Sequence, residues 1–214
     1  LHYPLRRQRQ MCIRDRKDFG LAFCNTVSDK NPYVAGPLRR TDCSLVSDGA
    51  AALVLADAET AASLQRAIGF RSRVQANDIL ALSRRNPIAF EGGRRAWAGA
   101  LANAGLGIGD LDLVETHDCF TMAEMIEYEI MGLAAPGEGW KVIREGRTRM
   151  EGDLPVNPSG GLKSRGHPIG ATGVSQHVMA AMQLMGEAGD MQVPGAELAG
   201  VFLSLIHISE PTRP

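Results

Sequence analysis

Cysteine is scarce in this 214-residue chain, and its few cysteines are not arranged in pairs. The four are Cys12, Cys24, Cys43 and Cys119, and no two of them form a C-x-x-C motif. A disulfide-stabilised scaffold and a structural zinc site are therefore disfavoured, and a reducing, cytoplasmic location is expected. Long hydrophobic runs are lacking as well, so we expect no membrane-spanning segment and no membrane partner.

The two ends of the chain show no recognisable pattern of helix or strand residues. The DNA sequences that could encode them, however, are related to each other. Residues 11–16 can be back-translated as ATG TGT ATA AGA GAC AG, and residues 203–208 as CTG TCT CTT ATA CAC ATC. These strings are reverse complements over their shared length and resemble the transposon end of a sequencing-library adapter. We therefore expect residues 1–16 and 203–214 to derive from adapter DNA and leave them out of the fold prediction.

Positive charge is in short supply once these flanks are set aside. The flanks hold six of the 23 basic and two of the 24 acidic residues, which leaves 17 basic and 22 acidic residues in 17–202 and a net charge of −5. No basic face survives, so nucleic acid is not expected as a partner. The remaining stretch is long enough to bury a hydrophobic core.

Strand and helix patterns alternate along residues 17–202, which indicates a layered α/β fold. A continuous apolar run at 50–56 predicts a strand buried on both faces. Further strands are predicted at 70–76, 111–115 and 197–202. Helices are predicted at 59–67, 91–104 and 122–131, the last with a capping box of Thr121 and Glu124. Residues 17–42 are interpreted as a loop, and residues 133–155 as either a hairpin or a loop.

Glycines surround a single histidine between residues 157 and 173. The stretch reads Asn157-Pro-Ser-Gly-Gly-Leu-Lys-Ser-Arg-Gly-His-Pro-Ile-Gly-Ala-Thr-Gly173, and its backbone can approach another group closely. Apolar residues recur at helical spacing from Val174, so a helix is expected to begin near Ala171 with its free N–H groups directed at the loop. An oxyanion or a thiolate would be stabilised there, with His167 as base or hydrogen-bond donor.

A second group of polar residues follows the strand predicted at 111–115. His117, Asp118 and Cys119 lie between that strand and the next helix, where an open α/β sheet usually places its site. For Asp118, hydrogen bonding to the loop backbone is the expected role.

Together these motifs resemble the thiolase family. Residues 157–161 with Gly166-His-Pro-Ile-Gly-Ala-Thr-Gly173 are similar to the histidine loop of thiolases, and His117-Asp-Cys-Phe120 is similar to the signature of the sterol-carrier-protein type. Ser47-Asp-Gly-Ala-Ala51 and Pro37-Leu-Arg39 resemble the same subfamily. The resemblance implies a thiolase-like α/β/α/β/α fold in an incomplete copy. Residues 17–58 would end the N-terminal domain, and residues 59–202 would form a truncated C-terminal domain.

The resemblance also implies a reaction. In thiolases a cysteine of the first half attacks the thioester of a 3-ketoacyl-CoA, and no residue of 17–202 has a matching context, so this stretch alone is expected to be inactive. His167 would activate that cysteine, Cys119 would move the proton on the α-carbon, and His117 would orient a water in the oxyanion hole. The implied substrate-binding residues are Asn157, Gly160, Gly161 and Gly170.

The implied partners are acyl-CoA substrates of lipid metabolism, with coenzyme A as co-substrate, no permanently bound cofactor and no metal. A homodimer or homotetramer is expected of the full-length protein. For Lys163 and Arg165, contact with coenzyme A phosphates and plain exposure to solvent both stay open. Three other functions also stay open: a retro-aldolase acting on a CoA ester, a decarboxylating condensing enzyme, and a non-catalytic subunit of the same fold.

Overall fold

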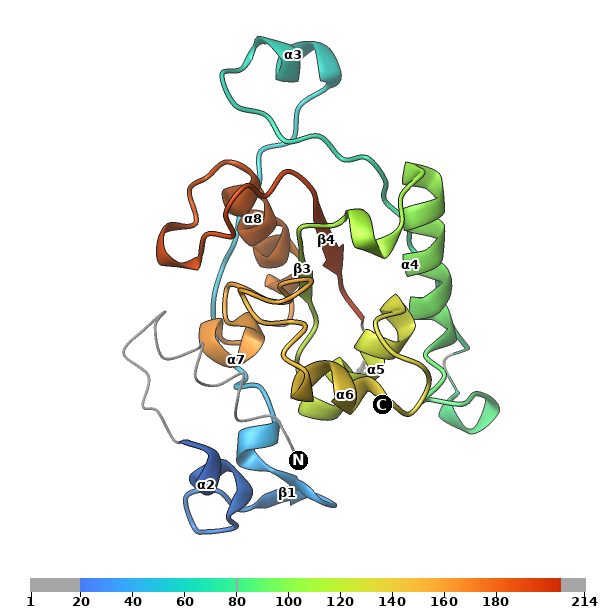
Figure 1. Ribbon diagram of the computed structural model, residues 1–214, viewed down its shortest axis with the longest axis vertical. Helices are drawn as coiled ribbons and strands as arrows, with labels where there is room; N and C mark the ends of the chain where they lie inside the picture. The colour runs from blue at the N-terminus through green and yellow to red at the C-terminus, as the bar shows by residue number, and fades with distance from the viewer. Residues whose placement is uncertain (1–19, 80, 205–214) are drawn as a thin grey trace, which may run out of the picture.

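The computed structural model describes residues 20–79 and 81–204, which contain both helices and strands (Figure 1). The α-helices are α2 (Gly20–Asn25), α3 (Ala58–Ser63), α4 (Glu91–Ala104), α5 (Thr121–Met131), α6 (Gly139–Arg144), α7 (Gly161–Arg165) and α8 (Thr172–Leu184). The strands are β1 (Tyr33–Ala35), β2 (Leu38–Arg39), β3 (Leu113–Thr116) and β4 (Ala199–Phe202). Short 3₁₀ helices are η1 (Arg40–Asp42), η2 (Leu82–Arg84), η3 (Ile108–Asp110) and η4 (Gly189–Met191). The expected α/β class is confirmed.

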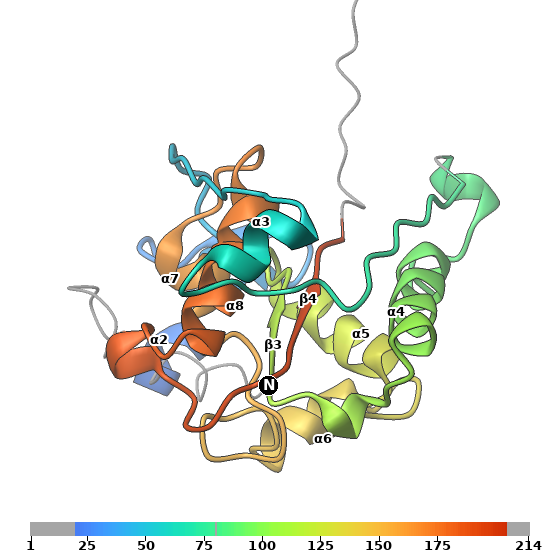
Figure 2. The ribbon, with the colours of Figure 1, turned by 90° about the horizontal axis from the view of Figure 1, so that it is seen from above.

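Strand β3 is the centre of the fold. It pairs in parallel with β4, with Leu113 opposite Ala199. On its other side the Val114 amide donates to the Pro155 carbonyl at 2.9 Å, and Val114 and Val156 form a parallel bridge. The sheet lies between α8 on one side and α4 on the other, as Figures 1 and 2 both show. All four residues of β3 are buried as a result.

The hydrophobic core fills the space between the sheet and helices α4 and α5. Trp97 of α4 meets Phe202 of β4 edge to face, with ring centroids 5.8 Å apart. A Cβ on Gly93 would lie 2.9 Å from the Phe202 ring, so the close approach of α4 to β4 requires glycine at that position. Tyr128 of α5 and Val156 complete the same cluster.

Three of the predicted helices occur where they were expected. Helix α4 ends at Gly105, whose φ of +67° provides the left-handed stop. Helix α5 ends at Gly132 in the same way, with φ +88°. Helix α8 begins at Thr172, one residue from the predicted start. Helix α3 is shorter than predicted, and its N-cap is Asp57, whose side chain accepts the Thr60 N–H.

The predictions of strands at 50–56 and 70–76 were wrong for the described chain. Residues 50–56 form no strand, and Val54 is 97% and Leu55 75% exposed. Residues 70–76 are irregular, and Phe70 is 53% exposed. An apolar run becomes a buried strand only when neighbouring strands pair with it, and no described segment pairs with either stretch.

The predicted capping box at the start of α5 was also wrong. Phe120 is the N-cap residue and makes no side-chain cap. Thr121 Oγ1 donates instead to Asp42 at 3.5 Å, and buried Glu124 accepts the Tyr128 hydroxyl at 2.6 Å. A tertiary contact therefore engages Thr121, and a contact one turn along the same helix engages Glu124.

Two regions interpreted as loops contain regular structure. The stretch 17–42 includes α2 and the β1–β2 hairpin, organised by buried Asn31, whose amide donates to the Phe23 and Thr26 carbonyls at 3.0 Å each. The stretch 133–155 includes α6 rather than a hairpin. Of the ends expected to be adapter-derived, only Leu203 and Ser204 belong to the described residues. None of the helices in 20–79 and 81–204 combines the length and hydrophobicity needed to cross a membrane.

Candidate active site

The turn between β3 and α5 presents three polar residues at the carboxyl end of a buried strand. His117 and Cys119 are 3% and 4% exposed, and Asp118 is fully buried. The strand and helix that flank the turn are both packed in the core, so the turn is held at both ends. The predicted position of these residues beyond a strand end is confirmed.

The glycine-rich loop brings His167 against His117. The two Nε2 atoms are 3.4 Å apart, and the rings meet at 62° with centroids separated by 5.1 Å. His167 is 9% exposed, and its Nδ1 is 2.7 Å from Thr172 Oγ1 in the first turn of α8. Two histidines that are fifty positions apart in the sequence thus share one buried site, with Cys119 on the same turn as His117.

Asp118 fastens the two loops together. Its carboxylate accepts the backbone N–H of Leu162 at 2.8 Å and that of Lys163 at 3.5 Å. Both N–H groups belong to the first turn of α7, where the helix has no partners of its own for them. The expected role of Asp118, hydrogen bonding to the loop backbone, is confirmed.

A third segment lies beside both loops, and sequence reasoning missed its position. The Ser44 amide donates to the Cys119 carbonyl at 2.7 Å, and the His167 amide donates to the Leu45 carbonyl at 3.0 Å. Cys43 bridges to Phe120 and Val46 to His167 in the same manner as strand residues. The extended stretch 43–46 therefore fixes the spacing of the two loops. The adjoining Ser47-Asp-Gly motif was a signal that this stretch belongs to the site.

The four residues assigned to substrate binding occupy different environments. Asn157, at φ +50°, accepts the Thr116 N–H on its side-chain oxygen at 2.6 Å and is 2% exposed. Gly160 and Gly161 are buried at the start of α7, with φ +84° and +63°. Gly170 is exposed and lines a surface pocket. Asn157, Gly160 and Gly161 thus shape the loop, and a binding role for any of the four stays a prediction.

A buried carboxylate on β3 is a second feature that sequence reasoning missed. Glu115 is fully buried and accepts the Ser159 hydroxyl at 2.7 Å and the Arg165 guanidinium at 3.3 Å. Burial raises the pKa of the Glu115 carboxyl, and Arg165 and Ser159 work in the opposite direction. A charged residue at the end of the strand predicted at 111–115 was the available signal. Arg165 is therefore bound to protein groups, and Lys163 is only 7% exposed, so the two are not a solvated pair.

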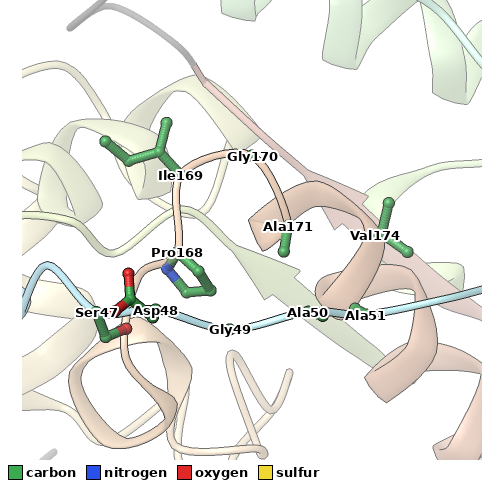
Figure 3. A pocket seen from close by; sticks show the side chains of 10 residues that line it. All are labelled: Ser47, Asp48, Gly49, Ala50, Ala51, Pro168, Ile169, Gly170, Ala171 and Val174. Carbon is green, nitrogen blue, oxygen red and sulfur yellow. The ribbon is translucent and has the colours of Figure 1, made fainter.

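A shallow pocket adjoins the histidine loop (Figure 3). Residues 47–51 form one wall, and Pro168, Gly170 and the start of α8 form the other, around a volume of about 410 Å³. Asp48 is the only charged residue among the described residues that line it. A Cβ on Gly49 would lie 3.0 Å from the Pro168 ring, so the walls meet closely at this point.

The surroundings of Cys119 favour its protonated form. Burial raises the pKa of the Cys119 thiol to about 12, and the carboxylates of Glu127 and Asp118 add to the shift. At neutral pH the thiol therefore keeps its proton, and Cys119 is suited to donate a proton rather than to attack as a thiolate.

Alkylation of the cysteines tests this environment directly. With a pKa of about 12, the thiolate fraction of Cys119 at pH 8 is roughly one in ten thousand, so its modification by iodoacetamide should be slow and rise about tenfold per pH unit. Half-buried Cys43 serves as the internal reference and should react faster at each pH. Peptide mass spectrometry resolves the sites. A Cys119 rate that levels off near pH 8 would contradict the prediction.

Comparison with known sequences shows which proteins this chain resembles. The family described as Thiolase C-terminal domain-like matches residues 74–203, which is more than half of the chain. An acetyl-CoA acetyltransferase of Methanothermobacter thermautotrophicus is 46% identical over 167 residues, 77% of this chain and 44% of that protein. Sterol carrier protein 2 of Bos taurus is 39% identical over 170 residues, 73% of this chain and 30% of that protein.

A solved structure shares the fold. The Ltp2-ChsH2(DUF35) aldolase superposes with a TM-score of 0.66 at 18% identity, covering 92% of this chain and 54% of that one. This similarity confirms the predicted thiolase-like fold. The chain spans less than half the length of the curated relatives described above.

Proposed function

This chain belongs to the family of thiolase C-terminal domains, and we propose that it is part of an acyltransferase that makes or breaks the carbon–carbon bond of a 3-ketoacyl-CoA. The reaction transfers an acyl group between that carbon and the thiol of coenzyme A. The full-length parent would carry out the reaction, because the relatives extend well beyond the part that this chain matches.

The observation that carries the proposal is the contact between His117 and His167 at the buried end of β3. Their Nε2 atoms are 3.4 Å apart, with Cys119 two residues from His117. Carbon–carbon bond cleavage next to a thioester needs a base for the nucleophile, a donor for the enolate oxygen and a group that moves a proton on carbon. The three residues supply one side chain for each task.

We assign the tasks as follows. His167 takes the proton of the attacking thiol, which the parent provides. His117 orients a water in the oxyanion hole, and this water donates a hydrogen bond to the developing enolate oxygen. Cys119 exchanges the proton on the α-carbon, a role that fits a thiol whose pKa is raised to about 12 by burial and by Glu127 and Asp118. The substrates are acyl-CoA thioesters, and coenzyme A is the co-substrate rather than a resident cofactor.

Product analysis tests the proposal. The full-length parent is incubated with a 3-ketoacyl-CoA and free coenzyme A. We expect one molecule of coenzyme A to be consumed for each substrate, with acetyl-CoA and a shortened acyl-CoA formed in equal amounts. Omission of coenzyme A should stop turnover.

Three other outcomes would overturn the proposal. Cleavage of a β-hydroxy CoA ester without added coenzyme A would establish a retro-aldolase. Release of carbon dioxide from a malonyl thioester would establish a decarboxylating condensing enzyme. Absence of any turnover by the folded full-length protein would favour a non-catalytic subunit.

A further inference from the structure

The two ring nitrogens of His167 have different surroundings. Nε2 faces His117 Nε2 at 3.4 Å, whereas Nδ1 lies 2.7 Å from Thr172 Oγ1. A neutral imidazole carries its proton on one nitrogen only, and the other nitrogen then accepts. Which nitrogen carries the proton decides whether His167 can act as a base toward the site.

Besides His167 Nδ1, the Thr172 hydroxyl has a second neighbour, the carbonyl oxygen of Pro168. Oγ1 lies 3.0 Å from the Pro168 carbonyl, in donor geometry, and the residue is 1% exposed. The same carbonyl is fixed in place by the Ala171 and Thr172 amides, which donate to it at 2.8 and 2.9 Å. If the hydroxyl hydrogen pointed to His167 instead, two oxygens would face each other at 3.0 Å with no hydrogen between them.

We propose that Thr172 is a positioning residue that holds His167 in the Nδ1–H tautomer. The Thr172 hydroxyl donates to the Pro168 carbonyl and accepts the hydrogen of His167 Nδ1. The lone pair of Nε2 is then directed to the side where His117 lies, and in the absence of the attacking thiol it accepts the Nε2–H of His117 across the 3.4 Å gap. The inference deepens the proposed function, on which its catalytic meaning rests, since a base must present an unprotonated nitrogen to the attacking thiol.

The position of Thr172 in the fold suits this task. Thr172 is the first residue of α8, and its hydrogen-bond partner Pro168 belongs to the histidine loop. The hydroxyl therefore lies where the helix and the loop meet. Ser175, one turn further along, donates to the Thr172 carbonyl at 2.9 Å and accepts from Arg165 at 3.2 Å. The hydroxyl that orients His167 is thus anchored through α8 to the buried Glu115 pair.

Nitrogen NMR tests the proposal on the present chain without any assay of activity. Long-range ¹H–¹⁵N correlations of the labelled 214-residue protein distinguish protonated from unprotonated ring nitrogens, and His167→Gln and His117→Gln variants assign the signals among the five histidines. We expect His167 with hydrogen on Nδ1 and His117 with hydrogen on Nε2. Hydrogen on Nε2 of wild-type His167 would overturn the proposal.

Two variants separate orientation from folding. Thr172→Val keeps the shape but removes the hydroxyl, and we expect His167 to lose its single tautomer. Thr172→Ser keeps the hydroxyl and should preserve it. A Thr172→Val protein with unchanged His167 nitrogen shifts would overturn the proposal. If the valine variant does not fold, the wild-type and Thr172→Ser spectra still show whether His167 carries its hydrogen on Nδ1.

In the full-length parent, Thr172→Val should lower the rate of acylation about tenfold or more with little change in KM, and Thr172→Ser should restore it. Failure of the parent to transfer acyl groups would refute the proposed function but leave the tautomer result standing. The two conclusions can therefore fail independently.

Discussion

Replacing Gly161 with alanine is expected to lower the free energy of unfolding of this chain by about 3 kcal/mol. Gly161 has φ +63°, a conformation that L residues with a side chain rarely adopt. An added Cβ would also lie 2.7 Å from Asp118 Cγ and within contact of both carboxylate oxygens. Asp118 would have to move, and its hydrogen bonds to the amides of Leu162 and Lys163 would be lost.

The same loop offers a matched control. Gly170 has no positive φ, and nothing lies within 4 Å of the position that its Cβ would take. Gly170→Ala should therefore change the free energy of unfolding by no more than about 0.5 kcal/mol. Urea denaturation followed by circular dichroism measures both variants. Equal stability of the two alanine variants would mean that Asp118 does not hold α7 as closely as the structure indicates.

Local patterns predicted α4, α5 and α8 well because a long helix carries its own signals. The apolar stripe of α4 and the left-handed glycine that ends it both lie within fifteen residues of sequence. A buried strand depends instead on partners that are distant in the sequence. The run 50–56 has the composition of such a strand, yet Val54 is 97% exposed because no described segment pairs with it. Composition could not reveal that.

The residues of the candidate site also differ in how far local sequence could predict them. The motifs identified His117, Cys119 and His167, and the structure brings the two histidines into contact. Of the supports of these side chains, only the hydrogen bonding of Asp118 to the loop backbone was predicted. Glu115 and the stretch 43–46 act through contacts that span more than forty and more than seventy positions, respectively. The sequence drew attention to each of them, through a charged residue within a predicted strand and through the adjoining Ser47-Asp-Gly motif, but it did not identify their distant partners.

Replacing Cys119 with alanine in the full-length parent should slow exchange of the α-proton by about 10²- to 10⁴-fold while leaving acylation in place. The alanine variant has no proton to donate, but the nucleophile and His167 are unchanged. Exchange is measured as deuterium uptake into acetyl-CoA in D₂O, and acylation as the mass of the covalent acyl-enzyme. His167→Ala should give the opposite result, with acylation slowed by a similar factor.

The two variants separate α-proton exchange from acylation, because Cys119 acts on the proton of the α-carbon and His167 on the proton of the attacking thiol. Cys24→Ala is the control, since Cys24 lies in α2, packed beside Asn31 and Thr41, and has no part in the proposed chemistry. It should retain both rates. Exchange at the wild-type rate in Cys119→Ala would show that another group moves the α-proton. The buried thiol with its raised pKa would then serve packing alone, and the proton role would pass to His117 or His167, whose Nε2 atoms meet in the same site.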